Sequence, residues 1–327
     1  MTDKLRWGFL GTARINNAIL NALPASSRGE AYAVASRDPQ RAEAYAREKN
    51  LPRWHAGYEH LLADPQVDVV YISLPNQLHA EWTLKALQAG KHVLCEKPFA
   101  LTPAEVDAAF AAARQAGRVV AEAFMYRHHP KILKAKALID EGALGEVHFM
   151  HASFSFTLTR PNDIRWKPEM GGGALWDVGC YPVSLARYLF GAPQAVDGWQ
   201  VSAPSGVDES FAGTLYFSGG RAAQLDCSFR MPNRQRAEVV GSDGVLTLTH
   251  PFRPDVDGSR LLLRRGEGEE EIAVDNPDRY LLEIEDLHEA VLNGRPPRIT
   301  PAETRGTVET IGALYRAAQA GPGGPRP

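Results

Sequence analysis

A chain of 327 residues is longer than one hydrophobic core usually requires, so we expect two domains. Its composition, 44% hydrophobic and 23% charged, is that of a globular protein and excludes extensive disorder. The formal net charge of −3 argues against nucleic acid as a partner. No apolar run approaches the roughly 18 residues of a membrane span, so we expect no membrane partner either.

The cysteines and the N-terminal stretch indicate a reducing compartment. Cys95, Cys180 and Cys227 are odd in number and far apart, and none belongs to a C-x-x-C pair. We therefore expect buried thiols rather than disulfides or redox centres. The opening stretch MTDKLRWGFLG has no signal-peptide pattern. We expect a cytoplasmic protein.

The first third of the chain alternates short apolar runs with helical patterns. Each run is continuously apolar, which is typical of parallel strands covered on both faces. One helical segment opens with Thr102, Pro103 and Glu105, a capping box, and closes at Gly117. We predict an α/β fold with a Rossmann doubly wound parallel sheet over residues 1–122. The predicted strands are LRWGFL (5–10), AYAVAS (31–36), VDVVYISL (67–74), KHVLCE (91–96) and RVVAEA (118–123).

From residue 123 the pattern becomes that of an α+β domain, predicted over residues 123–327. The helical segment PKILKAKALIDEG leads into a long strand, EVHFMHASFSFTL. Two hairpins follow, with Gly219-Gly220 and Asp243-Gly244 as their turns. We expect a large open sheet, mixed or antiparallel, then two helices and a disordered tail at 321–327.

The stretch GFLGTARINN follows the first strand, where a dinucleotide-binding fold carries G-x-G-x-x-G/A. Aligned from Gly11, this template meets Ala13 at its second glycine and Asn16 at its third. A phosphate-binding loop and a plain strand-to-helix turn both fit this incomplete pattern. Its place directly after the opening strand favours the phosphate loop.

The end of the second strand bears on the choice of cofactor. An acidic residue there would hold the free ribose of NAD, but the strand ends at Ser36 and Arg37. A hydroxyl and a guanidinium suit a 2′-phosphate, so we favour NADP over NAD. In the alternative reading, Arg37 is a solvated surface residue and Asp38 caps the next helix.

Glu96-Lys97-Pro98 lies at the carboxyl end of a predicted parallel strand, where open α/β sheets bind ligands. Lys97 could hydrogen-bond a substrate oxygen, or its stem could pack while its ammonium reaches solvent. Asp177 and Tyr181 lie four residues apart in a predicted helix, which places both on one face. A lysine, a phenol and a carboxylate can handle a proton, although Tyr181 could equally be a core residue and Asp177 a cap.

Taken together, these motifs resemble the Gfo/Idh/MocA oxidoreductase family. The resemblance covers nearly the whole chain, and within the family it is closest to the branch of dimeric dihydrodiol dehydrogenases and D-xylose dehydrogenases. Asn16 departs from the glycine or alanine that is usual in the family. The matching stretches are GFLGTARI, ASRDPQRA, SLPNQLH, CEKP, EAFMYRHHP and DIRWKPEMGGGALWDVGCYP.

The resemblance implies roles for individual residues. Lys97 would polarise the reacting oxygen, Tyr181 would be the acid or base, and Asp177 would complete the catalytic set. Tyr126 and Phe156, like Phe154 and Trp166, could line the substrate pocket or be ordinary core residues. The cofactor-binding residues would be Gly11, Thr12, Ala13, Arg14, Ile15, Ser36, Arg37, Leu74, Pro75, Asn76, His79, Glu96, Lys97, Arg165 and Trp166.

The resemblance further implies an NAD(P)-dependent enzyme that transfers hydride between nicotinamide and a hydroxyl or carbonyl of a sugar or cyclic diol. A polyol, an aldose or a dihydrodiol would be the substrate, and the protein would be a homodimer or homotetramer. Two alternatives are a non-catalytic NADP(H)-binding regulator and a redox-assisted lyase or glycosidase that retains NAD. We expect no metal site, because His55, His60, His128 and His129 lack the spacing of metal ligands.

Overall fold

The computed structural model describes residues 4–320, which fall into two compact units. Unit 1 comprises residues 4–128 and 278–304, and unit 2 comprises residues 129–277 and 305–320. This division differs from a single cut between residues 122 and 123, because helix α8 (Arg279–Asn293) belongs to unit 1. The predicted two-domain boundary stays a prediction, and the expected disordered tail lies outside the described residues.

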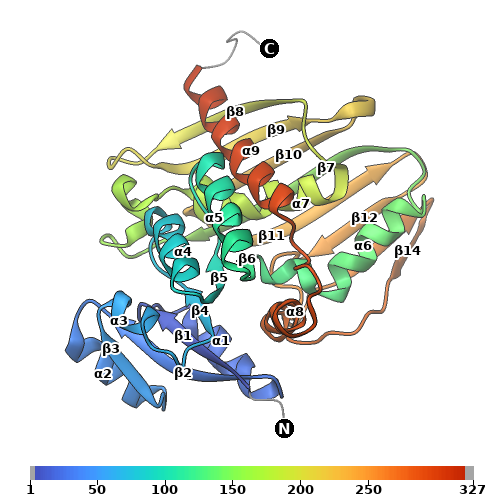
Figure 1. Ribbon diagram of the computed structural model, residues 1–327. Helices are drawn as coiled ribbons and strands as arrows, with labels where there is room; N and C mark the ends of the chain where they lie inside the picture. Colours follow the sequence, from blue (N-terminus) through green and yellow to red (C-terminus); the bar gives the residue numbers. More distant parts are fainter. Residues whose placement is uncertain (1–3, 321–327) are drawn as a thin grey trace. The chain divides into compact units, whose positions relative to one another are not determined.

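The sheet of unit 1 is parallel throughout, with the strand order β3-β2-β1-β4-β5-β6 (Figure 1). This confirms the predicted doubly wound sheet. The order reverses between β1 and β4, the point at which open α/β sheets bind ligands. The strands are β1 (Leu5–Leu10), β2 (Gly29–Ser36), β3 (Arg53–Ala56), β4 (Val69–Ile72), β5 (His92–Glu96) and β6 (Val120–Ala123).

Helix α5 (Pro103–Ala116) begins and ends at the predicted capping signals. Thr102 Oγ1 accepts the Glu105 amide at 3.3 Å, the Glu105 carboxylate accepts the Thr102 amide at 2.9 Å, and Gly117 ends the helix with φ 62°. Such caps contribute about 1 kcal/mol each. The helices are α1 (Asn16–Ala22), α2 (Pro39–Glu48), α3 (Tyr58–Leu62), α4 (His79–Gln88), α5 (Pro103–Ala116) and α8. Short 3-10 turns occur at Leu23–Ala25, Asn76–Leu78 and Met125–His128.

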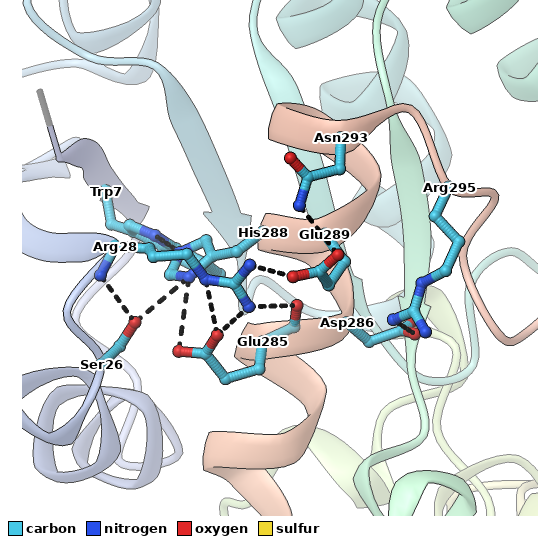
Figure 2. Close-up of polar contacts among 9 residues, drawn as sticks. All are labelled: Trp7, Ser26, Arg28, Glu285, Asp286, His288, Glu289, Asn293 and Arg295. Carbon is cyan, nitrogen blue, oxygen red and sulfur yellow. Dashed lines mark hydrogen bonds and ion pairs between the residues drawn. The ribbon is translucent and has the colours of Figure 1, made fainter. Parts of the chain in front are cut away.

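Helix α8 is attached to β1 and to the chain before β2 by the polar network that Figure 2 shows. Arg28 Nε donates to Glu285 Oε2 at 2.8 Å, and its guanidinium also pairs with Glu289. The buried His288 contacts Trp7 Nε1 at 3.1 Å and Ser26 Oγ at 3.2 Å. These contacts join residues more than 250 positions apart in the sequence, so α8 is part of the Rossmann unit.

The proton on His288 can be placed from its partners. Trp7 Nε1–H can only donate, so Nε2 of His288 accepts, and the proton of the neutral ring lies on Nδ1. That proton faces Ser26 Oγ. Burial lowers the pKa of His288 to about 4, from its ordinary value of 6.5. The folded protein therefore holds a neutral imidazole at this position.

We expect His288 to make the protein less stable as the pH falls from about 6.5 to about 4. In that window the unfolded chain takes up a proton at His288 that the folded protein does not bind, and the loss reaches about 3 kcal/mol. His288→Gln removes the titration and keeps an oxygen that accepts from Trp7. Urea unfolding at about pH 7 and about pH 4.5 should show a loss about 2–3 kcal/mol larger in the wild type. Equal losses would contradict the assignment.

Unit 2 is built on an eight-stranded sheet of order β14-β13-β12-β11-β7-β10-β9-β8 (Figure 1). Only β10 and β7 pair in parallel, so the sheet is mixed. The predicted turns Gly219-Gly220 and Asp243-Gly244 join antiparallel neighbours. The strands are β7 (Val147–Thr157), β8 (Ala195–Ser202), β9 (Asp208–Tyr216), β10 (Ala222–Ser228), β11 (Arg230–Gly241), β12 (Val245–Thr249), β13 (Leu261–Arg265) and β14 (Gly268–Glu271).

The α-helices of unit 2 are α6 (Pro130–Asp140), α7 (Cys180–Phe190) and the greater part of α9 (Pro301–Ala320). Helix α7 packs on β7 and β10 and is preceded by a π-helical turn at Leu175–Gly179. Three 3-10 turns lie at Ile164–Trp166, Pro168–Met170 and Ser218–Gly220. No helix among residues 4–320 has the length and apolar character needed to cross a bilayer.

Candidate active site

The loop between β1 and α1 presents backbone amides that have no acceptor within the described residues. Gly11 has φ 88°, a left-handed conformation that favours glycine, and its own amide binds the Ala35 carbonyl at 2.9 Å. The amides that follow lack acceptors, and they belong to Thr12, Ala13, Arg14 and Ile15. Unpaired amides at a helix start suit the oxygens of a pyrophosphate. The loop therefore fits the dinucleotide that the sequence predicts.

Asn16, which stands where the template has its third glycine, links this loop to the loop after β4. Its side chain is fully buried, and Nδ2 donates to the Gly11 carbonyl at 2.9 Å. Ser73 Oγ donates to Asn16 Oδ1 at 2.6 Å. The asparagine is thus satisfied by hydrogen bonds across the point where the strand order reverses. Ser73 was not singled out from the sequence, because its partner is 57 residues away.

The polar residues at the end of β2 differ in their partners. The Asp38 carboxylate accepts the amides of Gln40 and Arg41 at 3.0 and 3.3 Å, so it caps α2. Ser36 is buried and its Oγ accepts the Asp38 amide at 3.2 Å. Arg37 is exposed and has no ion-pair partner in the part of the chain that the structure describes. A guanidinium and a hydroxyl at this edge suit a phosphate.

The segment after β4 begins with two buried residues, Ser73 and Leu74, followed by half-buried Pro75 and Asn76. His79, at the start of α4, is 1% exposed. Both of its ring nitrogens face backbone carbonyl oxygens at 2.7 Å, one of Leu74 and one of Pro98. His79 therefore directs its polar atoms at the protein backbone, and its predicted contact with the cofactor stays a prediction.

Lys97 lies directly after β5, at the carboxyl end of the parallel sheet, as the sequence predicts. Its side chain is half-buried, and the peptide bond to Pro98 is cis. Tyr71 donates its hydroxyl to Glu96 Oε1 at 2.5 Å. Burial raises the pKa of Tyr71 well above its ordinary value, so the phenol keeps its proton and remains a donor. Glu96 is thereby held beside the lysine.

In unit 2, the predicted catalytic Asp177 and the predicted cofactor-binding Arg165 form an ion pair. Arg165 Nε donates to Asp177 Oδ2 at 2.6 Å, and its Nη1 also contacts Asp163 Oδ1 at 3.2 Å. The attraction of Asp177 raises the pKa of Arg165, which stays charged. Asp177 is thus a paired carboxylate, which makes it better suited to orient groups than to take a proton.

The helical geometry assumed for Asp177 and Tyr181 needs correction. Asp177 lies in the π-helical turn Leu175–Gly179, and Tyr181 lies in the first turn of α7. A π turn is wider than an α turn, so a spacing of four does not carry the α-helical relation between the two side chains. π turns are rare in proteins, and those that occur are often found at functional sites. The turn that carries Asp177 is therefore consistent with the predicted site.

The aromatic residues predicted near the site form two clusters in unit 2. Tyr181 is 6% exposed, and its ring centroid lies 5.3 Å from Phe154 and 5.4 Å from Phe252. A second cluster joins Phe156 and Trp166 through Phe229, at 5.4 and 5.3 Å. In unit 1, Tyr126 is fully buried in the 3-10 turn Met125–His128. The substrate contacts of Phe156 and Tyr126 stay predictions.

Asp208, which the sequence analysis missed, supports the π-helical turn. Its carboxylate accepts the Leu175 amide at 2.7 Å and the Tyr315 hydroxyl at 2.6 Å. Burial raises the pKa of Asp208 to about 6. Gly173, with φ 120°, leaves room for this carboxylate, because a Cβ there would lie 2.2 Å from Asp208 Oδ1. Gly173 of the GGGALWD motif therefore serves this packing.

The cysteines and His55 have the following surroundings. The three cysteines are buried thiols, as expected. His55 Nε2 contacts Asp64 Oδ2 at 3.1 Å. Within residues 4–320, no group of three histidine, cysteine, aspartate or glutamate side chains is placed to hold a metal ion.

Comparisons with known proteins agree with this fold. Residues 5–124 match the oxidoreductase family with an NAD-binding Rossmann fold, and residues 132–247 match the GFO/IDH/MocA C-terminal domain. The chain is 39% identical over 321 residues to D-xylose 1-dehydrogenase (NADP(+)) 2 of Haloferax volcanii, covering 97% of this chain and 98% of that protein. It is 33% identical over 249 residues to trans-1,2-dihydrobenzene-1,2-diol dehydrogenase of Xenopus tropicalis, covering 74% of each.

Solved structures extend the likeness. KijD10, a 3-ketoreductase from Actinomadura kijaniata in complex with NADP and TDP-benzene, superposes with a TM-score of 0.91 at 32% identity. The match covers 96% of this chain and 98% of that chain. The strand order, the amide-lined loop and the matched Rossmann family define an NAD(P)-dependent oxidoreductase. The chain belongs to the Gfo/Idh/MocA oxidoreductase family, which confirms the resemblance inferred from its motifs.

Proposed function

We propose that this protein is an NADP-dependent dehydrogenase that oxidises a secondary alcohol or the anomeric hydroxyl of an aldose, or runs the reverse reduction. The observation that carries the proposal is Lys97 at the carboxyl end of β5, in a sheet whose phosphate loop fits a dinucleotide. The similarity to a D-xylose dehydrogenase and a dihydrodiol dehydrogenase supports an aldose, a polyol or a cyclic diol as the substrate.

In this proposal, Lys97 and Tyr181 divide the work at the reacting oxygen. The ammonium of Lys97 hydrogen-bonds the substrate oxygen and stabilises the negative charge that develops there. As the carbon–hydrogen bond breaks with its electron pair, the hydroxyl of the substrate gives its proton to Tyr181. The bound nicotinamide supplies the hydride acceptor, or the donor in the reverse direction.

Two further observations support these roles. Variants of the A. kijaniata 3-ketoreductase have been solved at a lysine and at a tyrosine, and those two positions are as far apart in its sequence as Lys97 and Tyr181 are here. Asp177 is paired with Arg165, so we assign it the orientation of neighbouring groups rather than proton transfer. Glu96 is assigned to the ribose next to the nicotinamide.

We assign the preference for NADP to Ser36 and Arg37. The free guanidinium of an arginine adds charge-assisted hydrogen bonds to a 2′-phosphate, while Asp38 is engaged in capping α2. Relatives described with NADP support this choice. We also propose a cytoplasmic location, from the composition of the chain. Assembly as a homodimer or homotetramer is proposed from the family.

Arg37→Ala is expected to weaken NADP binding by about 10- to 100-fold, since a hydrogen bond to a charged group contributes about 1.5–3 kcal/mol. Binding of NAD, which has no 2′-phosphate, should change by less than about threefold. Isothermal titration of both cofactors measures this. Arg47→Ala is the matched control. It removes an exposed arginine from α2, the helix that follows Arg37. An equal loss for NAD and NADP would contradict the assignment.

The two alternatives make different predictions about turnover. A regulator would bind NADP(H) and convert no substrate, and a redox-assisted lyase would consume substrate without net change in the cofactor. The test is the absorbance of reduced nicotinamide when the wild type is mixed with NADP or NAD and D-xylose, other aldoses, polyols or trans-dihydrodiols. Net reduction with one of these classes supports the dehydrogenase and ranks its substrates.

A further inference from the structure

Two buried polar side chains hold the backbone of the turn Lys97–Phe99. His79 Nδ1 lies 2.7 Å from the Pro98 carbonyl oxygen, and its Nε2 lies 2.7 Å from the Leu74 carbonyl oxygen. The histidine thus links the lysine turn after β5 to the segment after β4. Both segments belong to the proposed site. All of these contacts lie within unit 1.

Glu122, in β6, holds the other side of the same turn. Its Oε1 accepts the Phe99 amide at 3.1 Å. Its second oxygen, Oε2, is buried, and the Thr304 side chain and the charge of Arg127 favour the ionised form of this carboxyl group. Burial raises the pKa of Glu122 to about 7. Burying a carboxyl group costs free energy, and an apolar side chain would fill this position without that cost.

The backbone of the turn is therefore held at two consecutive residues, Pro98 and Phe99. The Pro98 carbonyl faces His79, the Phe99 amide donates to Glu122, and the Phe99 ring stacks on Phe110 at 5.4 Å. The peptide before Pro98 carries Lys97, so any shift of this backbone moves the lysine. A misplacement of about 1 Å at a catalytic group can cost about 100-fold in rate.

We propose that His79 and Glu122 are positioning residues that set the orientation of Lys97 toward the substrate oxygen. This inference deepens the proposed function and rests on it. His79 then acts through the lysine turn rather than by touching the cofactor. Because a neutral imidazole has one N–H, the ring can donate to only one of the two carbonyls at a time.

Matched substitutions separate the two carbonyl contacts of His79, and the inference requires that the ring donates from Nδ1 to the Pro98 carbonyl. Asparagine places its amide nitrogen near the position of Nδ1, and glutamine places it near Nε2. His79→Asn should therefore keep the bond to Pro98 and hold kcat within about threefold of the wild type. His79→Gln should lose that bond and lower kcat by about 10- to 100-fold. Both variants should keep the KM for substrate within about threefold.

Glu122 offers a second, independent pair. Glu122→Gln keeps an oxygen that accepts from Phe99 and should retain most of the wild-type kcat, whereas Glu122→Leu should lower it as His79→Gln does. Hydrogen exchange of the Lys97, Phe99, Ala100 and Leu101 amides in the cofactor-free protein is the readout that does not require turnover. We expect faster exchange of these amides in His79→Gln and Glu122→Leu. In the matched variants His79→Asn and Glu122→Gln, exchange should be unchanged.

The outcomes distinguish this inference from the proposed function. If Lys97→Met abolishes turnover while His79→Gln and Glu122→Leu keep the wild-type kcat, the positioning role is wrong and the function stands. If all four variants lose kcat and melting temperature alike, the residues serve only stability and the inference is overturned. If the wild type turns over no substrate, or Lys97→Met is fully active, the proposed function fails and this inference fails with it.

Discussion

Lys97→Met is expected to lower kcat by about 10²- to 10⁴-fold, the range found when a group that stabilises the transition state is removed. Methionine keeps much of the stem of the lysine and removes its charge and its three donors. Binding of NADP should stay within about threefold, because the phosphate loop and the end of β2 do not involve this side chain. Steady-state kinetics together with isothermal titration measure both quantities.

The matched control for this variant is Lys136→Met. Lys136 lies on α6 and pairs with Asp140 on the surface, so its loss should leave kcat unchanged. Wild-type activity in Lys97→Met would contradict the role assigned to the lysine. In that case its ammonium would only be solvated at the edge of the sheet, the alternative that the sequence left open.

Tyr181→Phe is expected to lower kcat by about 10²- to 10⁴-fold, because it removes the group proposed to exchange the proton. The ring contacts with Phe154 and Phe252 should survive, since phenylalanine keeps the aromatic ring. The melting temperature should therefore change by less than about 2 °C.

Tyr216→Phe is the matched control for the loss of a phenolic hydroxyl in the same unit. Tyr216 is exposed and donates to Asp197 Oδ2 at 2.7 Å, so its loss should not affect the rate. A Tyr181→Phe enzyme that keeps its kcat would show that another group exchanges the proton. Tyr181 would then be an ordinary core residue.

The parallel sheet could be predicted because burial on both faces imposes continuous apolar runs on its central strands. Strand β3 was missed, since it lies at an edge and its RWHA sequence is largely exposed. Strands β14 and β8 were missed for the same reason, because they are the two edge strands of the sheet in unit 2. All four residues of β14 are exposed. Edge strands lack the two-sided burial that makes a strand recognisable.

Some parts of the candidate site could likewise be predicted from the sequence, and others could not. Lys97 and the Gly11 loop could be placed because the ends of parallel strands are local features of the sequence. The bonds of Asn16 to Ser73 and of Leu175 to Asp208 could not, because they join residues 57 and 33 positions apart. The π turn around Asp177 was also out of reach, since a spacing of four residues indicates an α-helix by default.

The central claim is that this protein transfers hydride directly between substrate and NADP. The measurement that tests it most directly uses the best substrate from the panel, deuterated at its carbinol carbon, in a single turnover with the wild type. The predicted result is reduced cofactor that carries one deuterium, formed in proportion to the enzyme. Cofactor recovered in its oxidised form and without deuterium would contradict the account, whether the substrate was left intact or cleaved.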